Sequence, residues 1–279
     1  IPLGSLSKLA EAERHRVIDA YADSKVFRNC TDVAVTHTWR LYSARSRDLE
    51  VASVALEPRA LDAAIAGNAA ARLKSGNTCT VARATIAGRN VVVKRYNIKS
   101  WLHGLGRLLR RSRASVSWAN AHRLRMHGIA TAQPLALVER RFGPCRAQGY
   151  FLAEHVEGPD IAEWMRDKSI DQALKKSLAD KLAELMYKLR LLQIAHGDMK
   201  ATNIHVAGEM PVLIDLDSLR HHVSRRRFER QHVKDLKRLV RNWADRPHIQ
   251  RMLIEALQQR YGNDPLLKSA GVALVGNNK

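Results

Sequence analysis

Apolar residues recur at helical spacing near the start of the chain, which predicts an amphipathic helix over residues 5–23. Residues 32–42 alternate between apolar and polar side chains, which predicts a strand. A short helix is expected over residues 58–66, because Pro58 suits a first helical turn and Gly67-Asn68 ends it. Residues 1–69 are therefore treated as an N-terminal extension, to which the sequence assigns no role.

The pattern changes at residue 70 to short alternating runs. Three runs are separated by two turns of small and polar residues, as in an antiparallel meander. The third run, Val91-Val92-Val93-Lys94-Arg95-Tyr96, is rich in β-branched residues. The elements predicted here are strands over 70–74, 80–86 and 91–96, turns over 75–79 and 87–90, a helix over 115–127, and strands over 129–138 and 149–154.

The remainder of the chain is mainly helical in its periodicity. Leucine recurs at helical spacing over residues 171–193, from Leu174 to Leu192, and we expect these side chains in a core. Other helices are predicted over 161–165, 233–243 and 249–261. A small antiparallel sheet followed by a helical part indicates an α+β fold.

Composition adds a strong positive charge, with 47 Lys and Arg against 27 Asp and Glu, or +20. Such a charge attracts anionic partners such as nucleic acid, an anionic membrane or a phosphorylated substrate; the alternative is a solvated basic surface. No apolar run reaches the ~20 residues that span a bilayer, and no signal peptide is evident. The three scattered cysteines favour reduced thiols over a metal site.

The charge is unevenly distributed. Residues 63–138 contain thirteen Lys and Arg and no Asp or Glu. Within them, residues 99–113 combine Trp101 and several leucines with Lys99 and four arginines. This composition is typical of a segment lying on anionic lipid, but it also suits a basic linker whose leucines pack on the sheet.

The strongest chemical signal is His196-Gly197-Asp198-Met199-Lys200-Ala201-Thr202-Asn203, followed by an apolar run ending at Asp215. Its spacing resembles the catalytic loop and metal-binding Asp of protein kinases. Asp198 is expected to orient the acceptor hydroxyl or accept its proton, and Lys200 to reach the γ-phosphate of ATP. Asn203 and Asp215 supply hard oxygen ligands for Mg²⁺.

Three further positions complete the expected site. His196 is read as a structural residue that fixes the loop by hydrogen bonds. Asp217 is either a second metal contact or, as we favour, a tie between the loop and the following basic tract. Lys94, which follows three valines after a hairpin, is expected to bind the α- and β-phosphates.

The remaining nucleotide contacts are expected around two turns. Gly76 and Thr78 lie in the first turn of the meander, where backbone N–H groups and the Thr78 hydroxyl would meet phosphate. The polar turn after the apolar strand 149–154 suits a hinge, and backbone groups near Glu154 are expected to pair with adenine.

Over residues 70–245 the chain resembles the lipopolysaccharide kinase family, which includes Kdo and heptose kinases. The matching segments are VVVKRYN (91–97), WANAHRLRMHGIATAQPLALVE (118–139), FLAEHVEG (151–158), HGDMKATNIHV (196–206) and VLIDLDSLR (212–220). The resemblance implies a two-lobed protein-kinase-like fold, with a small nucleotide-binding lobe over 70–155 and a helical catalytic lobe over 156–279. It implies ATP- and Mg²⁺-dependent phosphorylation of a heptose or Kdo hydroxyl of the lipopolysaccharide inner core.

The same resemblance implies a cytoplasmic protein, peripheral on the inner face of the bacterial inner membrane. The partners expected are lipopolysaccharide core or another anionic glycolipid and the anionic membrane surface, not nucleic acid. Two alternatives stay open: a kinase for a protein or small soluble molecule, and a non-catalytic kinase-like protein that binds anionic lipid.

One departure from the kinase pattern is clear. Kinase-like sites pair the strand lysine with a Glu from the next helix, whereas residues 115–127 contain no acid. Ser117 or Asn120 occupies the expected place. Lys94 is then oriented by Asp215, by an amide or hydroxyl, or by the nucleotide alone.

Overall fold

The computed structural model describes residues 3–67, 72–76, 79–97 and 111–271. Contacts divide the chain into two compact units. The first comprises Ile1–Gly128 and Ala132–His155, and the second comprises Ile129–Thr131 and Val156–Lys279. Among the described helices, none combines the length and the apolar character that crossing a bilayer requires.

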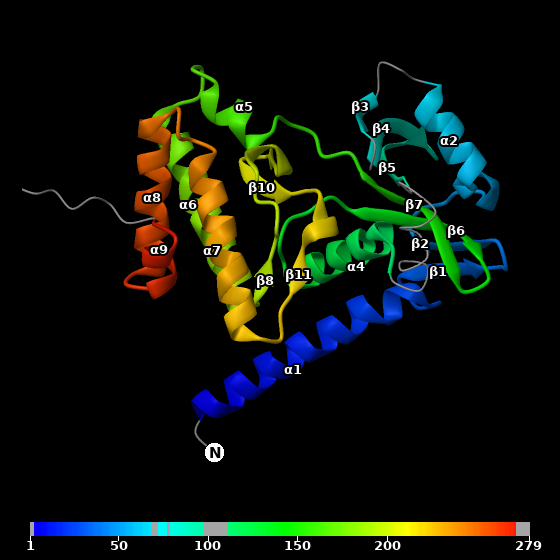
Figure 1. The fold of residues 1–279 in the computed structure, drawn as a ribbon, viewed down its shortest axis with the longest axis horizontal. Helices are drawn as coiled ribbons and strands as arrows, with labels where there is room; N and C mark the ends of the chain where they lie inside the picture. Colours follow the sequence, from blue (N-terminus) through cyan, green and yellow to red (C-terminus); the bar gives the residue numbers. More distant parts are fainter. Residues whose placement is uncertain (1–2, 68–71, 77–78, 98–110, 272–279) are drawn as a thin grey trace, which may run out of the picture. The chain divides into compact units, whose positions relative to one another are not determined.

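Seven strands of the described residues form one antiparallel sheet in the first unit, in the order β1-β2-β6-β7-β5-β4-β3 (Figure 1). The strands are β1 (Val33–His37), β2 (Leu41–Ser46), β3 (Arg72–Gly76), β4 (Cys79–Ile86), β5 (Arg89–Tyr96), β6 (Pro134–Phe142) and β7 (Cys145–Glu154). The helices of this unit are α1 (Leu3–Asp23), η1 (Lys25–Phe27), η2 (Ser53–Leu56), α2 (Pro58–Ala66) and α4 (Arg113–Met126). The antiparallel sheet and the helices confirm the α+β class.

The N-terminal extension takes part in this sheet. Residues 32–42, predicted as one strand, instead contain the whole of β1, a turn and the start of β2. The Thr38 hydroxyl accepts the N–H groups of Arg40 and Leu41 at 3.4 and 3.0 Å, and this side-chain turn breaks the strand. β2 then pairs with β6, with Leu41 opposite Arg140.

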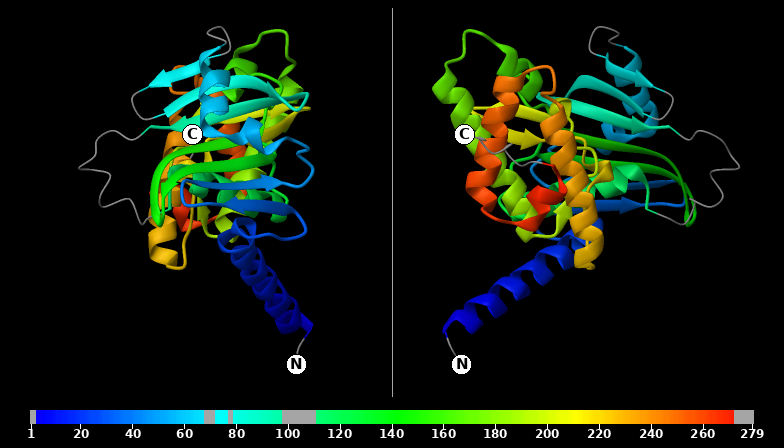
Figure 2. Two further views of the ribbon diagram at one scale, coloured as in Figure 1. Left: turned by 90° about the vertical axis from the view of Figure 1, so that its right-hand side faces the viewer. Right: turned by 60° about the vertical axis from the view of Figure 1, so that its left-hand side comes forward.

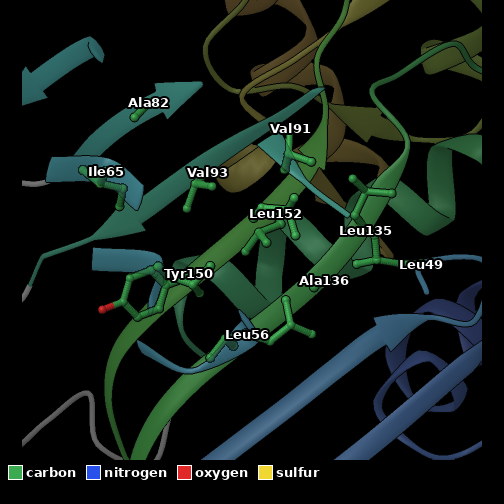
Figure 3. Packing of buried hydrophobic residues seen from close by; sticks show 13 residues of the cluster. Leu49, Leu56, Ile65, Ala82, Val91, Val93, Leu135, Ala136, Tyr150 and Leu152 are labelled. Carbon is green, nitrogen blue, oxygen red and sulfur yellow. The ribbon is translucent and has the colours of Figure 1, made fainter. Parts of the chain in front are cut away.

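The two faces of the sheet are covered by different helices. Val91, Val93 and Leu152 pack with Leu61 and Ile65 of α2 in one buried hydrophobic cluster (Figure 3). Side chains alternate along a strand, so Lys94 and Tyr96 project from the opposite face. There the Tyr96 hydroxyl is 2.9 Å from the Ser117 hydroxyl of α4. The sheet is thus a middle layer, with α2 on one side and α4 on the other.

Helix α1 extends this packing through α4. The Trp118 Nε1–H of α4 donates to the Val26 carbonyl at 2.9 Å. The Arg123 guanidinium of α4 donates to Asp19 and Asp23 of α1, each at 2.8 Å. Its side chain is only 5% exposed, so a buried cation joins the two helices.

The second unit is mainly helical. Its elements are α5 (Ile161–Arg166), α6 (Gln172–Leu191), β8 (Ile194–Ala195), η4 (Ala201–Asn203), β9 (Ile204–Ala207), β10 (Met210–Leu213), η5 (Leu216–Ser218), β11 (Arg220–His221), α7 (Arg225–Arg241), α8 (Pro247–Tyr261) and α9 (Pro265–Ser269). Helices α6 and α8 lie side by side, as do α7 and α8 (Figure 2). The short strands form two antiparallel pairs, β9–β10 and β8–β11.

The predicted leucine periodicity is largely the core of α6. Leu178, Leu182 and Leu189 are buried, but Leu174 in the first turn is exposed. Helix α7 begins at Arg225, earlier than the predicted start at residue 233. One side of the helix is buried within the basic tract, where Phe228 and His232 lie one turn apart among charged residues. The charged residues obscured this helical periodicity in the sequence.

Candidate active site

The predicted catalytic loop lies in the second unit between β8 and β9. Gly197 has a φ of +79°, and a Cβ there would lie 2.8 Å from the Ser218 carbonyl oxygen. A side chain at this position would strain the backbone and collide with a neighbouring strand connection. Glycine therefore allows the loop to pass close to the segment that follows Asp215.

A buried carboxylate from α7 anchors the loop. Asp235 accepts the backbone N–H of His196 at 2.7 Å and that of Gly197 at 3.1 Å. Burial raises the pKa of Asp235, and the two N–H donors partly offset that effect. The anchor holds backbone rather than side chains, so it sets the path of the chain into Asp198.

The His196 ring lies inside the same region. Its Nε2 is 3.2 Å from the Ile214 carbonyl oxygen, so Nε2 carries the proton and donates to that carbonyl. The ring is fully buried, and burial lowers its pKa, which keeps the imidazole neutral. A neutral, enclosed ring joins the catalytic loop to the residue before Asp215.

Asp198 is held from two sides. Its Oδ1 accepts from Arg238 Nη1 at 2.7 Å, while its Oδ2 accepts from Asn203 Nδ2 at 3.2 Å and lies 3.1 Å from Lys200 Nζ. The Asp198 side chain keeps 25% of its surface exposed. The carboxylate is thus fixed in one orientation and still accessible.

Asn203 and Asp215 are brought together by the β9–β10 hairpin. The Asn203 carbonyl accepts the N–H of Ile214 at 3.0 Å, directly before Asp215. Because Asn203 Nδ2 donates to Asp198, the amide oxygen Oδ1 is the atom of this side chain that a metal ion would contact. Asp215 has φ 58° and ψ 59°, a left-handed conformation that costs a non-glycine residue about 1 kcal/mol or more. Residues in such strained conformations are found most often at functional sites.

This pair fits magnesium held partly by phosphate. Within the described parts of the chain, no group of three or more His, Cys, Asp or Glu residues could hold a metal ion. Mg²⁺ commonly takes one or two protein oxygens and completes its shell with water and substrate phosphates. Asn203 and Asp215 match that sparse donor set.

Asp217 follows in η5 and is buried. Its Oδ1 accepts from the Ser218 hydroxyl at 3.3 Å, and its backbone carbonyl accepts from Arg220 Nη1 at 3.1 Å. One contact with the basic tract is therefore made by the main chain of Asp217.

Lys94 belongs to the first unit. It lies in β5, opposite Val81 of β4 and Phe151 of β7, and is half-buried. Its Nζ is 5.2 Å from the centre of the Tyr96 ring. The residue is thus on the sheet face that α4 covers, in the middle of the sheet.

The two residues proposed in place of the acid expected on α4 both make hydrogen bonds. The Ser117 hydroxyl bonds to Tyr96, and the Asn120 amide oxygen accepts from Arg123 at 2.7 Å. A buried acid does occur beneath α4, at Glu139 of β6. It accepts from Arg141 at 2.6 Å and from the hydroxyls of Ser112 and Ser115 at the start of α4.

The other predicted nucleotide contacts are only partly described. Gly76 is the last residue of β3, opposite Cys79, and so belongs to the strand end rather than to the turn. Thr78 and residues 99–110 of the basic segment lie outside the described residues. Glu154 ends β7, and its carboxylate pairs with Arg89 at 3.0 Å.

The first two hinge N–H groups already have partners. The Glu154 N–H donates to Gln133 and the His155 N–H to Asn90, each at 2.9 Å. These two N–H groups are therefore engaged in hydrogen bonds within the first unit.

Two residues of this site escaped the sequence prediction, Asp235 and Arg238. Both are in α7, three positions apart, and both reach the catalytic loop about forty residues earlier. Their spacing places them on neighbouring parts of one helical face, which is a weak signal inside a tract crowded with charged residues. The available sequence signal was Asp235, an acidic residue on the buried side of an otherwise basic helix.

Comparison with known proteins agrees with this geometry. No curated protein matches the chain. The model of the lipopolysaccharide kinase (Kdo/WaaP) family matches residues 65–261. That range contains Lys94, the catalytic loop, Asp215 and the α7 anchor. The chain therefore belongs to the lipopolysaccharide kinase (Kdo/WaaP) family.

Proposed function

We propose that this chain transfers the γ-phosphoryl group of ATP to a sugar hydroxyl, of heptose or Kdo, in the lipopolysaccharide inner core. The single observation that carries the proposal is the orientation of Asp198 by Arg238, Asn203 and Lys200 inside a loop anchored by Asp235. Phosphoryl transfer depends mainly on such positioning and on charge stabilisation.

Each residue has a distinct role in this proposal. Asp198 aligns the acceptor hydroxyl and takes its proton as the new O–P bond forms and the bond between the γ-phosphorus and ADP breaks. Lys200 and Arg238 each contact one carboxylate oxygen of Asp198, so the carboxylate is held in the orientation that alignment of the acceptor needs. Lys200, 56% exposed, is able to turn toward the transferring phosphoryl group.

The nucleotide side is assigned on the same basis. Bound Mg²⁺ would neutralise charge on the β- and γ-phosphates, with Asn203 Oδ1 and Asp215 holding it. Lys94 would hold the α- and β-phosphates, and Gly76, Thr78 and the backbone near Glu154 would complete the nucleotide site. The domain proposal is a nucleotide-binding lobe over 70–155, a catalytic lobe over 156–279 and an extension over 1–69, arranged as in protein kinases.

An anionic acceptor is supported by the exposed side of α7. The same helix that supplies Asp235 and Arg238 carries basic residues spaced three and four apart along its exposed face. These residues are Arg226, Arg227, Arg230, Lys234, Lys237 and Arg241. A basic stripe beside the loop that holds Asp198 would attract the phosphates and carboxylates of a lipid-linked core, and hence the inner membrane surface.

The direct test is phosphate transfer from labelled ATP to purified lipopolysaccharide core, with the product identified by mass spectrometry. We expect Asp198→Asn to lower turnover by at least about 100-fold, while Asp180→Asn, an exposed acid of α6, retains it. Equal rates in wild type and Asp198→Asn would refute the assignment. Better transfer to soluble sugars, peptides or antibiotics would favour a soluble-substrate kinase. Failure to bind ATP and Mg²⁺ would favour a non-catalytic lipid-binding protein.

A further inference from the structure

A second basic site lies entirely within the first unit. A pocket of about 270 Å³ opens between the end of α1, β2, the β6–β7 hairpin and the start of α4. Four arginines line it: Arg28, Arg111, Arg141 and Arg146. Arg28 lies in the N-terminal extension and Arg111 just before α4, while Arg141 and Arg146 lie in the β6–β7 hairpin. The fold therefore brings charges that are far apart in the sequence together around one pocket.

Two of the guanidinium groups are held in place by aromatic rings. Arg111 lies over Phe27 at 4.9 Å from the ring centre, and Arg141 lies over Tyr42 at 4.2 Å. Stacking orients a planar guanidinium without neutralising it. The rings themselves belong to the pocket wall.

The acids nearby balance only part of this charge. Asp23 pairs with Arg111 at 2.8 Å, and Glu139 pairs with Arg141 at 2.6 Å. Burial disfavours the charged form of Glu139, but hydrogen bonds from Ser112, Ser115 and Arg141 outweigh it and keep its pKa below the ordinary value. Four guanidinium groups thus face two carboxylates, which leaves an excess of two positive charges.

The excess is located on two residues. The exposed Arg28 guanidinium makes no hydrogen bond or ion pair with any residue that the structure describes. Arg146 Nε is 3.6 Å from Glu139, while its Nη1 is buried and lacks a hydrogen-bond partner among the described residues. A buried donor without an acceptor points to an absent water or ion.

From this geometry we infer that the pocket is a binding site for a phosphate monoester group. The group carries close to two negative charges and three acceptor oxygens, which match the surplus charge and the forked N–H donors of arginine. The source is either a free phosphate or a phosphate carried on a lipid. Arg28, Phe27 and Tyr42 precede residue 65, so this site depends on a part of the chain that the family match does not include.

Inorganic phosphate is the simplest probe. The full chain is titrated at constant ionic strength, with a non-hydrolysable ATP analogue and Mg²⁺ present, and the rise in melting temperature gives the half-saturating phosphate concentration. We expect Arg28→Gln and Arg146→Gln each to raise that concentration about ten-fold, the usual effect of losing one charge-assisted hydrogen bond. Arg83→Gln removes an exposed arginine of β4 outside the pocket and is expected to behave as wild type.

Arg28→Gln keeps the test decisive, because the Arg28 side chain supports no contact that folding would need. Equal half-saturation in wild type, Arg28→Gln and Arg83→Gln would overturn the inference. Vesicles of phosphatidylcholine with phosphatidic acid identify the source. Loss of vesicle binding in Arg28→Gln supports a lipid-borne phosphate, and unchanged vesicle binding with weakened inorganic phosphate supports a soluble one.

Discussion

The catalytic loop and helix α4 are each anchored through one buried charged residue of a helix, Asp235 of α7 and Arg123 of α4 itself, and the two charges have opposite sign. Asp235 of α7 is an acceptor for two backbone N–H groups of the loop. Arg123 of α4 is a donor to two carboxylates of α1 and to Asn120. The first anchor shapes a backbone, whereas the second fastens one helix to another.

The difference shows where each element obtains its position. Asp235 and its partners all lie within residues 65–261, so the loop and its anchor belong to the matched region. Asp19 and Asp23 precede that region, so α4 is positioned by a segment outside it. Helix α4 is the helix in which kinase-like sites place the Glu partner of the strand lysine. In this chain α4 is therefore positioned by its ion pairs with α1.

Breaking the loop anchor should have the largest effect. Asp235→Ala leaves the N–H groups of His196 and Gly197 without their acceptor, and we expect a loss of about 2 to 5 kcal/mol in the free energy of unfolding. ATP turnover should fall with it, because Asp198 loses its orientation. Urea unfolding measures the loss of stability, and a turnover assay measures the loss of activity. Asp180→Ala, at an exposed position of α6, is the matched control; an unchanged midpoint in Asp235→Ala would contradict the anchoring role.

Breaking the α1–α4 anchor should cost somewhat less. Arg123→Met preserves much of the buried volume but removes the guanidinium that joins Asp19 and Asp23; both carboxylates keep some exposure to water, and Asp23 retains its pair with Arg111. We expect about 2 to 3 kcal/mol of destabilisation, measured by urea unfolding. Arg125→Met removes an exposed charge from the same helix and should cost under about 0.5 kcal/mol. Equal losses in the two variants would argue against a special role for Arg123.

Acid should weaken α7 through His232. This buried ring is 2.8 Å from the Tyr261 hydroxyl of α8, and burial lowers its pKa from 6.5 to about 4. The unfolded chain then binds a proton that the folded chain excludes, so stability is full above pH 6.5 and declines as the pH falls toward 4. His232→Gln should remove about 2 to 3 kcal/mol of this pH dependence. The free energy of unfolding is measured with urea at several pH values. If it depends on pH as steeply in His232→Gln as in wild type, the prediction is contradicted.

The smallest effect is expected at the edge of the loop. Arg238 is 45% exposed, so Arg238→Met should change stability by under about 1 kcal/mol. Turnover should nevertheless fall about ten-fold, because Asp198 loses one of the groups that orient it. Arg251→Met, at an exposed position of α8 outside the basic stripe, is the control. Urea unfolding alongside the turnover assay separates positioning from general damage; unchanged turnover in Arg238→Met would argue against this role.

The sequence was most informative where local chemistry decides structure. Helix α2 has the predicted bounds because Pro58 and Gly67 are start and stop signals. The predicted turn at 87–90 is tighter than expected, since Ala87 and Gly88 alone have positive φ and β5 begins at Arg89. An alanine with positive φ carries no turn signal, and its conformation follows from the pairing of the flanking strands.

The candidate site was predictable to the extent that its residues are neighbours in sequence. Asp198, Lys200 and Asn203 lie together as the motif indicates, and Asn203 meets the strand before Asp215. Asp235, Arg238 and Arg123 were not predictable, because each acts on residues far away along the chain. Charged residues on helices are usually exposed, so the sequence alone predicts a solvated side chain. Only the tertiary structure shows that such a residue is buried against a partner.

The pairing of β2 with β6 also has a consequence for biosynthesis. Because Leu41 lies opposite Arg140, the β1–β2 hairpin emerges from the ribosome long before its partner strand and must wait with an open edge. A chain shortened to the matched residues 65–261 would meet the reverse problem. Its β6 edge would be uncovered and Arg123 would have no carboxylates, so such a fragment should self-associate rather than yield a monomer for assay.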